Sequence, residues 1–114
     1  MFSLEVTLDY HDAEAAAAFW QEALGYERRY SRPPYVVIGP PAGAPGATVV
    51  LQQVPRSPEG TRAHLDLRVD DPEATVARLE ALGASVVGTV DEGWTGWTVM
   101  ADPWGTPLCV CPAR

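Results

Sequence analysis

The feature that most constrains this 114-residue chain is an internal repeat. Two stretches follow one plan, an alternating strand, an aspartate, a helix and an Ala-Leu-Gly ending: LEVTLDYHDAEAAAAFWQEALGY and HLDLRVDDPEATVARLEALGASV. Glu5 precedes Asp12 by seven residues, and His64 precedes Asp71 by seven residues. A repeat of this kind indicates that the two halves are copies of one supersecondary unit.

Each copy has the local signals of a strand followed by a helix. Apolar and polar residues alternate over residues 4–9 and 64–69, which gives each strand one apolar and one polar face. Asp12 and Asp71 are predicted helix N-caps, and a glycine is expected to end each helix. We expect each helix to cover the apolar strand face with a stripe of apolar residues, Ala16, Phe19, Trp20, Ala23 and Leu24 in the first copy and Val76, Leu79 and Leu82 in the second. The polar faces, with Glu5 and His64, then lie on the other side of the sheet.

Three further strands are predicted after each helix, at 26–31, 35–40 and 47–54 in the first half and at 85–90, 96–101 and 107–111 in the second. The sequence therefore predicts an α+β fold made of two tandem βαβββ modules. We expect a single domain over residues 1–114, with module one at about 1–55, a Pro- and Gly-containing linker at about 56–62 and module two at about 63–114.

Composition excludes several classes of function. The net charge of −7 argues against a nucleic-acid partner, because binding to a phosphate backbone depends on clustered Lys and Arg. No apolar run is long enough to cross a membrane, and the amino terminus lacks the features of a secretion signal, so we expect a soluble, cytoplasmic protein. Cys109 and Cys111 are separated by one residue on a predicted strand, a spacing that favours reduced thiols over a disulfide or a zinc motif.

The paired βαβββ modules, the motif HLDLRV and the closing segment WTVMADPWGTPLCV resemble the vicinal oxygen chelate superfamily, in particular its glyoxalase-like and bleomycin-resistance-like members. The resemblance covers essentially the whole chain. It implies a curved, cup-shaped mixed sheet with helices on the convex face and a ligand in the concave cup. It also implies, in many relatives, a divalent metal held by the first and last strand of each module.

Carrying those metal positions to this sequence gives Glu5, Gln52 (or Gln53), His64 and Cys109 as candidate ligands. The match to the resembled family is incomplete, because the last position usually holds a Glu that also moves the substrate proton, and here it holds Cys109. His64 and Glu5 are the only strong donors of the four, whereas a catalytic divalent site needs about three. We therefore expect no tightly bound catalytic metal. If a metal is bound, it would be Zn, Ni, Fe or Mn.

Polar strand residues and tryptophans together predict a ligand site in the cup, made of Glu5, Thr7, Gln52, His64, Asp66, Trp97 and Cys109. Trp94, Trp97 and Trp104 are close in sequence, and their rings suit stacking on a flat organic molecule, although core packing or a subunit contact would explain each of them equally well. A strand histidine is most often just a polar residue, and a free cysteine a small buried apolar one.

Three hypotheses follow for the function. We favour a small-molecule-binding protein whose ligand is an organic molecule, aromatic or cationic. The alternative is a metal-dependent enzyme, a lyase, isomerase or dioxygenase relative, acting on a substrate with vicinal oxygens; catalysis itself is left open. The third is a structural interaction module. In each case we expect a homodimer, because the sheet edges and exposed apolar surface would be covered by symmetric pairing.

Overall fold

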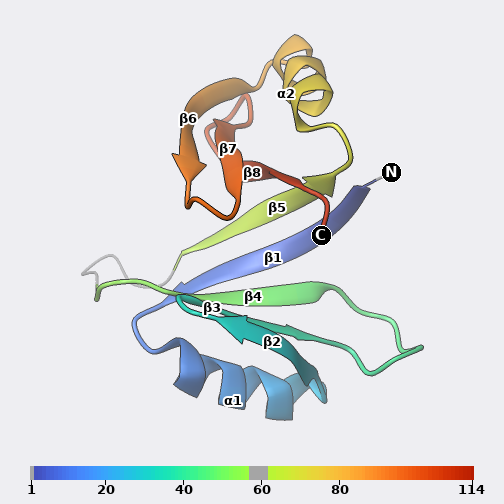
Figure 1. Ribbon diagram of the computed structural model, residues 1–114, viewed down its shortest axis with the longest axis vertical. Coiled ribbons are helices and arrows are strands. Elements are labelled where there is room, and N and C mark those ends of the chain that lie inside the picture. Colours follow the sequence, from blue (N-terminus) through green and yellow to red (C-terminus); the bar gives the residue numbers. More distant parts are fainter. Residues whose placement is uncertain (1, 57–61) are drawn as a thin grey trace. The chain divides into compact units, whose positions relative to one another are not determined.

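A computed structural model describes residues 2–56 and 62–114, and within these ranges it contains eight strands and two helices (Figure 1). Residues 57–61 of the predicted linker lie outside the described residues. In chain order the elements are β1 (Phe2–Tyr10), α1 (Ala13–Leu24), β2 (Glu27–Arg32), β3 (Tyr35–Gly39), β4 (Thr48–Gln53), β5 (Ala63–Val69), α2 (Pro72–Ala81), β6 (Ser85–Asp91), β7 (Gly96–Ala101) and β8 (Pro107–Pro112).

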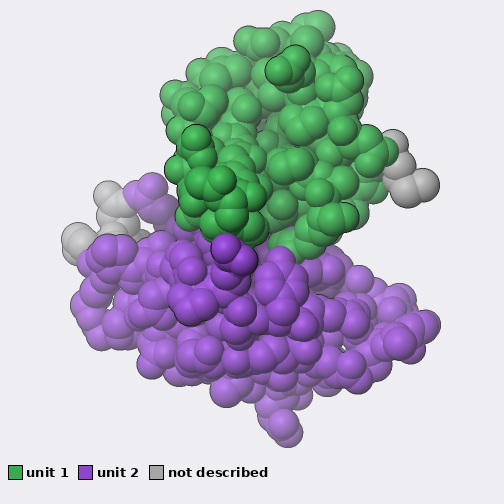
Figure 2. Space-filling model, in the orientation of Figure 1, with its two compact units in different colours: residues 1–4, 64–114 green, residues 5–63 purple. Residues whose placement is uncertain are grey.

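The chain forms two compact units, coloured separately in Figure 2. Unit 2 comprises the described part of residues 5–63, and its strands are ordered β2-β3-β4-β1. Unit 1 comprises residues 64–114 with residues 2–4, and its strands are ordered β6-β7-β8-β5. In both units the first and last strands of the repeat pair in parallel, β1 with β4 and β5 with β8, and the remaining neighbours are antiparallel. The predicted α+β class and its two βαβββ modules are thus confirmed.

Both predicted helix N-caps are present. The Asp12 carboxylate accepts a hydrogen bond from the backbone N–H of Ala15 at 3.0 Å, and the Asp71 carboxylate accepts one from Ala74 at 3.1 Å. At the other end of α1, Gly25 adopts a left-handed conformation with φ of 68°, which a residue with a side chain rarely adopts. The start of each helix is therefore encoded locally, by the same aspartate in both copies.

The core of unit 2 corrects the apolar stripe predicted for α1. The helix buries Ala13, Ala16 and Ala17, with Trp20 packed partly against them. Phe19 and Leu24, predicted to face the sheet, are 63% and 47% exposed. The physical reason is that the alanine run offers a second stripe with the same helical spacing, and small side chains let the helix lie closer to the strands.

The core of unit 1 is smaller. Val69, Met100 and Val110 are buried, and partly buried side chains pack around them: Leu67, Val76, Leu79, Ala84 and Leu108. Val76 and Leu79 of α2 thus cover the sheet as predicted. Leu82, the third residue of the predicted stripe, is 68% exposed because α2 ends at Ala81 and Leu82 is its C-cap. Neither α1 nor α2 is long and apolar enough to cross a membrane.

Candidate functional site

The site is built on the face of the unit 1 sheet that points away from α2. Leu67 and Val69 of β5 pack into the α2 core, so the alternate residues His64, Asp66 and Arg68 point to the opposite face. The parallel pairing of β5 with β8 places Asp66 beside Cys109 and Arg68 beside Cys111. This register brings together side chains that lie more than forty residues apart in the sequence.

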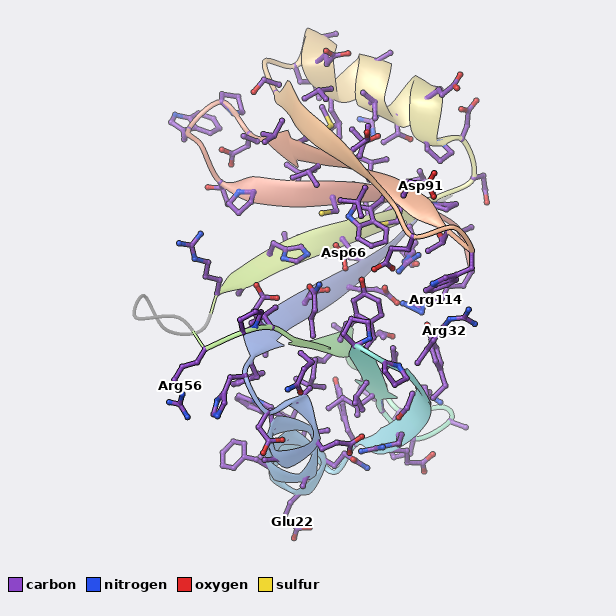
Figure 3. All side chains as sticks on the ribbon, turned by 60° about the vertical axis from the view of Figure 1, so that its left-hand side comes forward. Glu22, Arg32, Arg56, Asp66, Asp91 and Arg114 are labelled. Atoms are coloured by element: carbon purple, nitrogen blue, oxygen red, sulfur yellow. The ribbon has the colours of Figure 1, made fainter. Side chains whose placement is uncertain are left out.

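Three of these side chains form a compact group of potential donors. Ligand atoms of His64, Asp66 and Cys109 all lie within 4.8 Å of one another. Nε2 of His64 lies 3.1 Å from Oδ1 of Asp66, a distance at which an imidazole N–H donates to the carboxylate. Asp66 is buried, and the His64 side chain is only 20% exposed. Figure 3 labels Asp66 on β5. A carboxylate in such a place is stabilised by its partner, and it offers charge where solvent is largely excluded.

Burial controls the chemistry of Cys109. Burial raises the pKa of the Cys109 thiol from its ordinary value of 9.0 to about 12, and the negative charge of Asp66 beside it adds to the effect. Both Cys109 and Cys111 are buried, and neither forms a disulfide, as the sequence predicted. Cys109 is therefore a neutral thiol near pH 7, a weak hydrogen-bond donor rather than a nucleophile or a ready thiolate ligand.

An aromatic side chain belongs to the same face. Val99 of β7 pairs with Cys109 of β8, and Trp97 lies two residues before Val99, so it points to the same side of the sheet. Trp97 is half-buried. Arg68, on this face too, donates from Nη1 to the backbone carbonyl of Pro112 at 3.3 Å. The face thus combines an imidazole, a carboxylate, a guanidinium and an indole ring.

The donor group fits a divalent metal in kind. Imidazole nitrogen, carboxylate oxygen and thiolate sulfur are all zinc ligands, and in a tetrahedral site they would lie roughly 3.3 to 3.8 Å apart. His64, Asp66 and Cys109 could reach such spacings with small movements, since all three donor atoms are already within 4.8 Å. A metal would have to replace the His64–Asp66 contact and remove the Cys109 proton, and both steps cost free energy.

The predicted ligands of module one are not brought together, which corrects the metal set taken from the resemblance. In the β1–β4 pair, Glu5 lies beside Thr48 and Gln52 lies beside Asp9. Glu5 and Gln52 are therefore four residues apart along parallel strands, roughly 13 Å, too far to share one ion. Gln53, the other register considered, instead accepts from the backbone N–H of Ala13 at 2.8 Å and so supports the start of α1.

The two modules can be aligned through their helix N-caps, Asp12 and Asp71, whose residue numbers differ by 59. The last paired residues of β4 and β8, Gln53 and Pro112, differ by the same number. On this alignment Glu5, Thr7 and Val50 occupy the places of His64, Asp66 and Cys109. Glu5 and Thr7 are buried on the face of their sheet that points away from α1. Valine has no ligand atom, so this donor set occurs in module two and not at the equivalent positions of module one.

The tryptophans that are close in sequence are separated in space. Trp94 precedes β7 and Trp104 follows it, so the two residues lie beyond opposite ends of a six-residue strand that is roughly 20 Å long. Trp94 is 53% exposed and Trp104 is 87% exposed, in the turn where the N–H of Gly105 donates to the carbonyl of Asp102 at 3.0 Å. Of the predicted aromatic cluster, Trp97 is the residue that strand pairing places on the face that carries His64.

Sequence reasoning assigned Asp66 to the ligand-binding face but missed it as a donor beside Cys109. The available signal was alternation, which places Asp66 two residues after His64 on the same face. With Asp66 included, unit 1 alone supplies three potential donors, His64, Asp66 and Cys109.

Comparison with known proteins bears on the whole chain. The family model for the glyoxalase-like domain matches residues 5–111. No curated protein matches this sequence. Among solved structures, a glyoxalase/bleomycin resistance protein/dioxygenase superfamily member from Vibrio splendidus 12B01 is similar, with a TM-score of 0.66, 19% identity and coverage of 98% of this chain and 99% of that chain.

Two epimerases are also similar in structure. Methylmalonyl-CoA epimerase from Mycobacterium tuberculosis has a TM-score of 0.71 and 16% identity, covering 98% of this chain and 88% of that chain. A variant of methylmalonyl-CoA epimerase from Streptomyces coelicolor, in complex with 2-nitronate-propionyl-CoA, has a TM-score of 0.68 and 14% identity, covering 96% of this chain and 95% of that chain. At these identities the likeness shows a shared fold.

Proposed function

The chain belongs to the glyoxalase-like family, and we propose that it binds a small planar organic molecule on the polar face of the unit 1 sheet, without a tightly bound catalytic metal. The observation that carries this proposal is the largely buried His64–Asp66 pair, 3.1 Å apart, on a face that also holds Trp97. Ligand sites typically combine apolar and aromatic walls with a few fixed polar groups.

Each group has a role in this proposal. The Trp97 ring supplies a flat surface for stacking, and the His64 and Asp66 side chains fix the orientation of the ligand through hydrogen bonds. The Asp66 carboxylate favours a ligand with a donor or a positive charge, in keeping with an aromatic or cationic molecule. Glu5 and Thr7, buried on the polar face of unit 2, remain predicted ligand-binding residues.

A panel of cationic, anionic and neutral bicyclic aromatic fragments tests this function by ligand-observed NMR on the purified protein. We expect a fragment that binds the wild type, loses roughly tenfold or more in affinity in Trp97→Ala and His64→Ala, and keeps its affinity in Trp104→Ala, the matched control with an exposed indole. If no fragment binds, or if Trp97→Ala and His64→Ala bind as the wild type does, the proposal is wrong.

The metal-dependent enzyme remains the second candidate, and one observation favours it: the donor atoms of His64, Asp66 and Cys109 within 4.8 Å. Elemental analysis of untagged protein purified without chelator distinguishes the two. We expect well under one equivalent of zinc, nickel, iron or manganese. One equivalent of metal that is lost in His64→Ala, in Asp66→Asn and in Cys109→Ala would reverse the order of the candidates.

A further inference from the structure

Unit 2 contains an aromatic groove that the proposed function does not use. It lies where β1 ends and α1 begins, and its volume is about 440 Å³, within the range of small-molecule pockets. The residues that line it are Tyr10, His11, Asp12, Ala15, Ala16, Phe19 and Trp20. All of them belong to unit 2, so the groove is complete within that unit.

The aromatic walls of the groove are held in place before any ligand arrives. Nε1 of Trp20 donates to the hydroxyl of Tyr10 at 2.9 Å, which fixes the indole against the strand end. The ring of Phe19 meets that of Trp20 edge to face, with centroids 5.1 Å apart and planes at 87°. Ala15 and Ala16 leave the space between these rings and the helix start open. A preorganised apolar wall lowers the ordering cost of binding.

The fold does not require three aromatic side chains here, because the same corner of unit 1 is lined by one, Phe2. The equivalent groove of unit 1 is about 320 Å³ and is lined by Phe2, Val69, Asp70, Asp71, Ala74, Thr75 and Arg78. On the 59-residue alignment, Arg78 stands where Phe19 stands, and Asp70 where His11 stands. Phe19 is 63% exposed at a position where its own repeat carries Arg, and it adjoins Trp20, which is bonded to Tyr10, so it belongs to a contiguous aromatic patch.

Charges at the rim of the groove are already engaged. The Asp12 carboxylate accepts from the backbone N–H of Ala15. Nη2 of Arg56 lies 2.8 Å from Nε2 of His11, and because a guanidinium only donates, the imidazole nitrogen is the acceptor in this contact. Figure 3 labels Arg56, which follows β4. The Asp12 carboxylate and the Arg56 guanidinium carry opposite charges that balance at the rim, so the aromatic walls favour a ligand without charge.

We infer that this groove is a second small-molecule site, which takes a neutral planar aromatic molecule between Phe19, Trp20 and Tyr10. The ligand is recognised by stacking and edge contacts with the rings, and it covers apolar surface that is otherwise in contact with water. This site is separate in residues from the one proposed on the unit 1 sheet, so each can be tested without the other.

The test is a titration of ¹⁵N-labelled protein with 2-naphthol, which is planar and neutral at pH 7, followed by two-dimensional NMR. We expect the indole N–H signal of Trp20 to move in a saturable way. Phe19→Arg, which copies the residue at the equivalent place in module two, is expected to weaken binding at least fivefold. Leu24→Arg removes another exposed apolar side chain of α1 outside the groove, and it serves as the matched control with unchanged affinity.

Ala15→Leu provides a second variant, because it fills the groove from an exposed helix position and keeps both aromatic rings. It should weaken binding as Phe19→Arg does, whereas Trp97→Ala should leave this site unchanged. The inference is overturned if the Trp20 signal does not move, or if both groove variants bind as the wild type does. It is also overturned if sedimentation shows that Phe19→Arg converts a dimer into a monomer, since a second copy of the chain would then occupy the groove.

Discussion

The Cys109 thiol offers the sharpest test of the physical reasoning about the site. Its pKa is raised to about 12, so at pH 8 roughly one thiol in ten thousand is ionised, against about one in ten for an ordinary cysteine with a pKa of 9.0. Because the thiolate is the reacting species, native Cys109 should be alkylated by iodoacetamide about a thousand times more slowly than in the unfolded chain. The Cys111→Ser variant isolates this thiol, and mass spectrometry follows the reaction.

The causes of this pKa shift can be separated. Burial is the largest, and the charge of Asp66 is the next. In the Cys111→Ser background, Asp66→Asn removes the neighbouring charge without removing burial, so it should speed alkylation by less than urea does. If folded Cys109 reacted at the rate of the unfolded chain, the thiol would not be in the environment described, and the argument against a ready thiolate ligand would fail.

The same shift predicts how stability depends on pH. A group whose pKa is higher in the folded state stabilises that state at pH values below its unfolded pKa. For Cys109 this contribution is lost as the pH rises from about 9 towards 12. Between pH 8 and pH 10 the loss amounts to about one pKa unit, or ~1.4 kcal/mol. Urea unfolding of Cys111→Ser should therefore show about that much more destabilisation over this interval than Cys109→Ala/Cys111→Ser, and equal losses would contradict the assignment.

Three further outcomes are expected. Leu51→Ala empties a fully buried core position of unit 2 and should lower the free energy of unfolding by about 2 to 5 kcal/mol in urea; a loss below about 1 kcal/mol would contradict its place in the core. The backbone N–H of Thr106 donates to the Asp102 carboxylate and lowers its pKa in the folded state. The ionised carboxylate therefore stabilises the fold at pH values above its unfolded pKa, and this stabilisation is lost as the pH falls through its folded pKa. Acid unfolding of Asp102→Asn should then show a weaker pH dependence below about pH 4 than the wild type, and an unchanged profile would count against this turn. Sedimentation should find a homodimer at micromolar concentration, because the edge strand β6 exposes Val86 and Val87; a monomer alone would exclude it.

Local signals were sufficient for much of the fold. The helix starts follow from Asp12 and Asp71, whose side chains satisfy backbone N–H groups of their own first turn, so no distant residue is needed to place them. Strand faces follow from period-two alternation. Repetition then adds information, because a pattern found twice at the same spacing is far more specific than either copy alone.

Strand register could not be predicted from the sequence, and it determines which side chains are neighbours in the site. Alternation specifies which face a residue points to, but a shift of two residues keeps the face and changes the neighbour. Alternation alone therefore predicts Gln52 as the partner of Glu5, although β4 places Thr48 there and puts Val50 in the position equivalent to Cys109. The long segment between β1 and β4 carries no local signal that fixes this register.

The prediction of which face of α1 packs on the sheet was wrong for a related reason. In α1, two stripes have helical spacing, one with Phe19 and Leu24 and one made of alanines, and hydrophobicity alone favours the larger side chains. The structure buries Ala13, Ala16 and Ala17, because the core beneath this part of α1 already contains Ile38 and Leu51, and Trp20 packs at its edge. Packing volume, a property of the assembled core, therefore settled what periodicity left open.

Comparison of the two halves separates residues that the fold needs from residues that serve a site. Positions that differ little in chemistry between the copies, such as Asp12 and Asp71 or Leu51 and Val110, build caps and cores. Other equivalent positions differ in chemistry: Val50 against Cys109 on the polar sheet face, and Phe19 against Arg78 at exposed positions of the helices. Because one module forms with each of these residues, the shared fold alone does not dictate them. Each half thus acts as the structural control for the other, and the residues that differ are where binding should be sought.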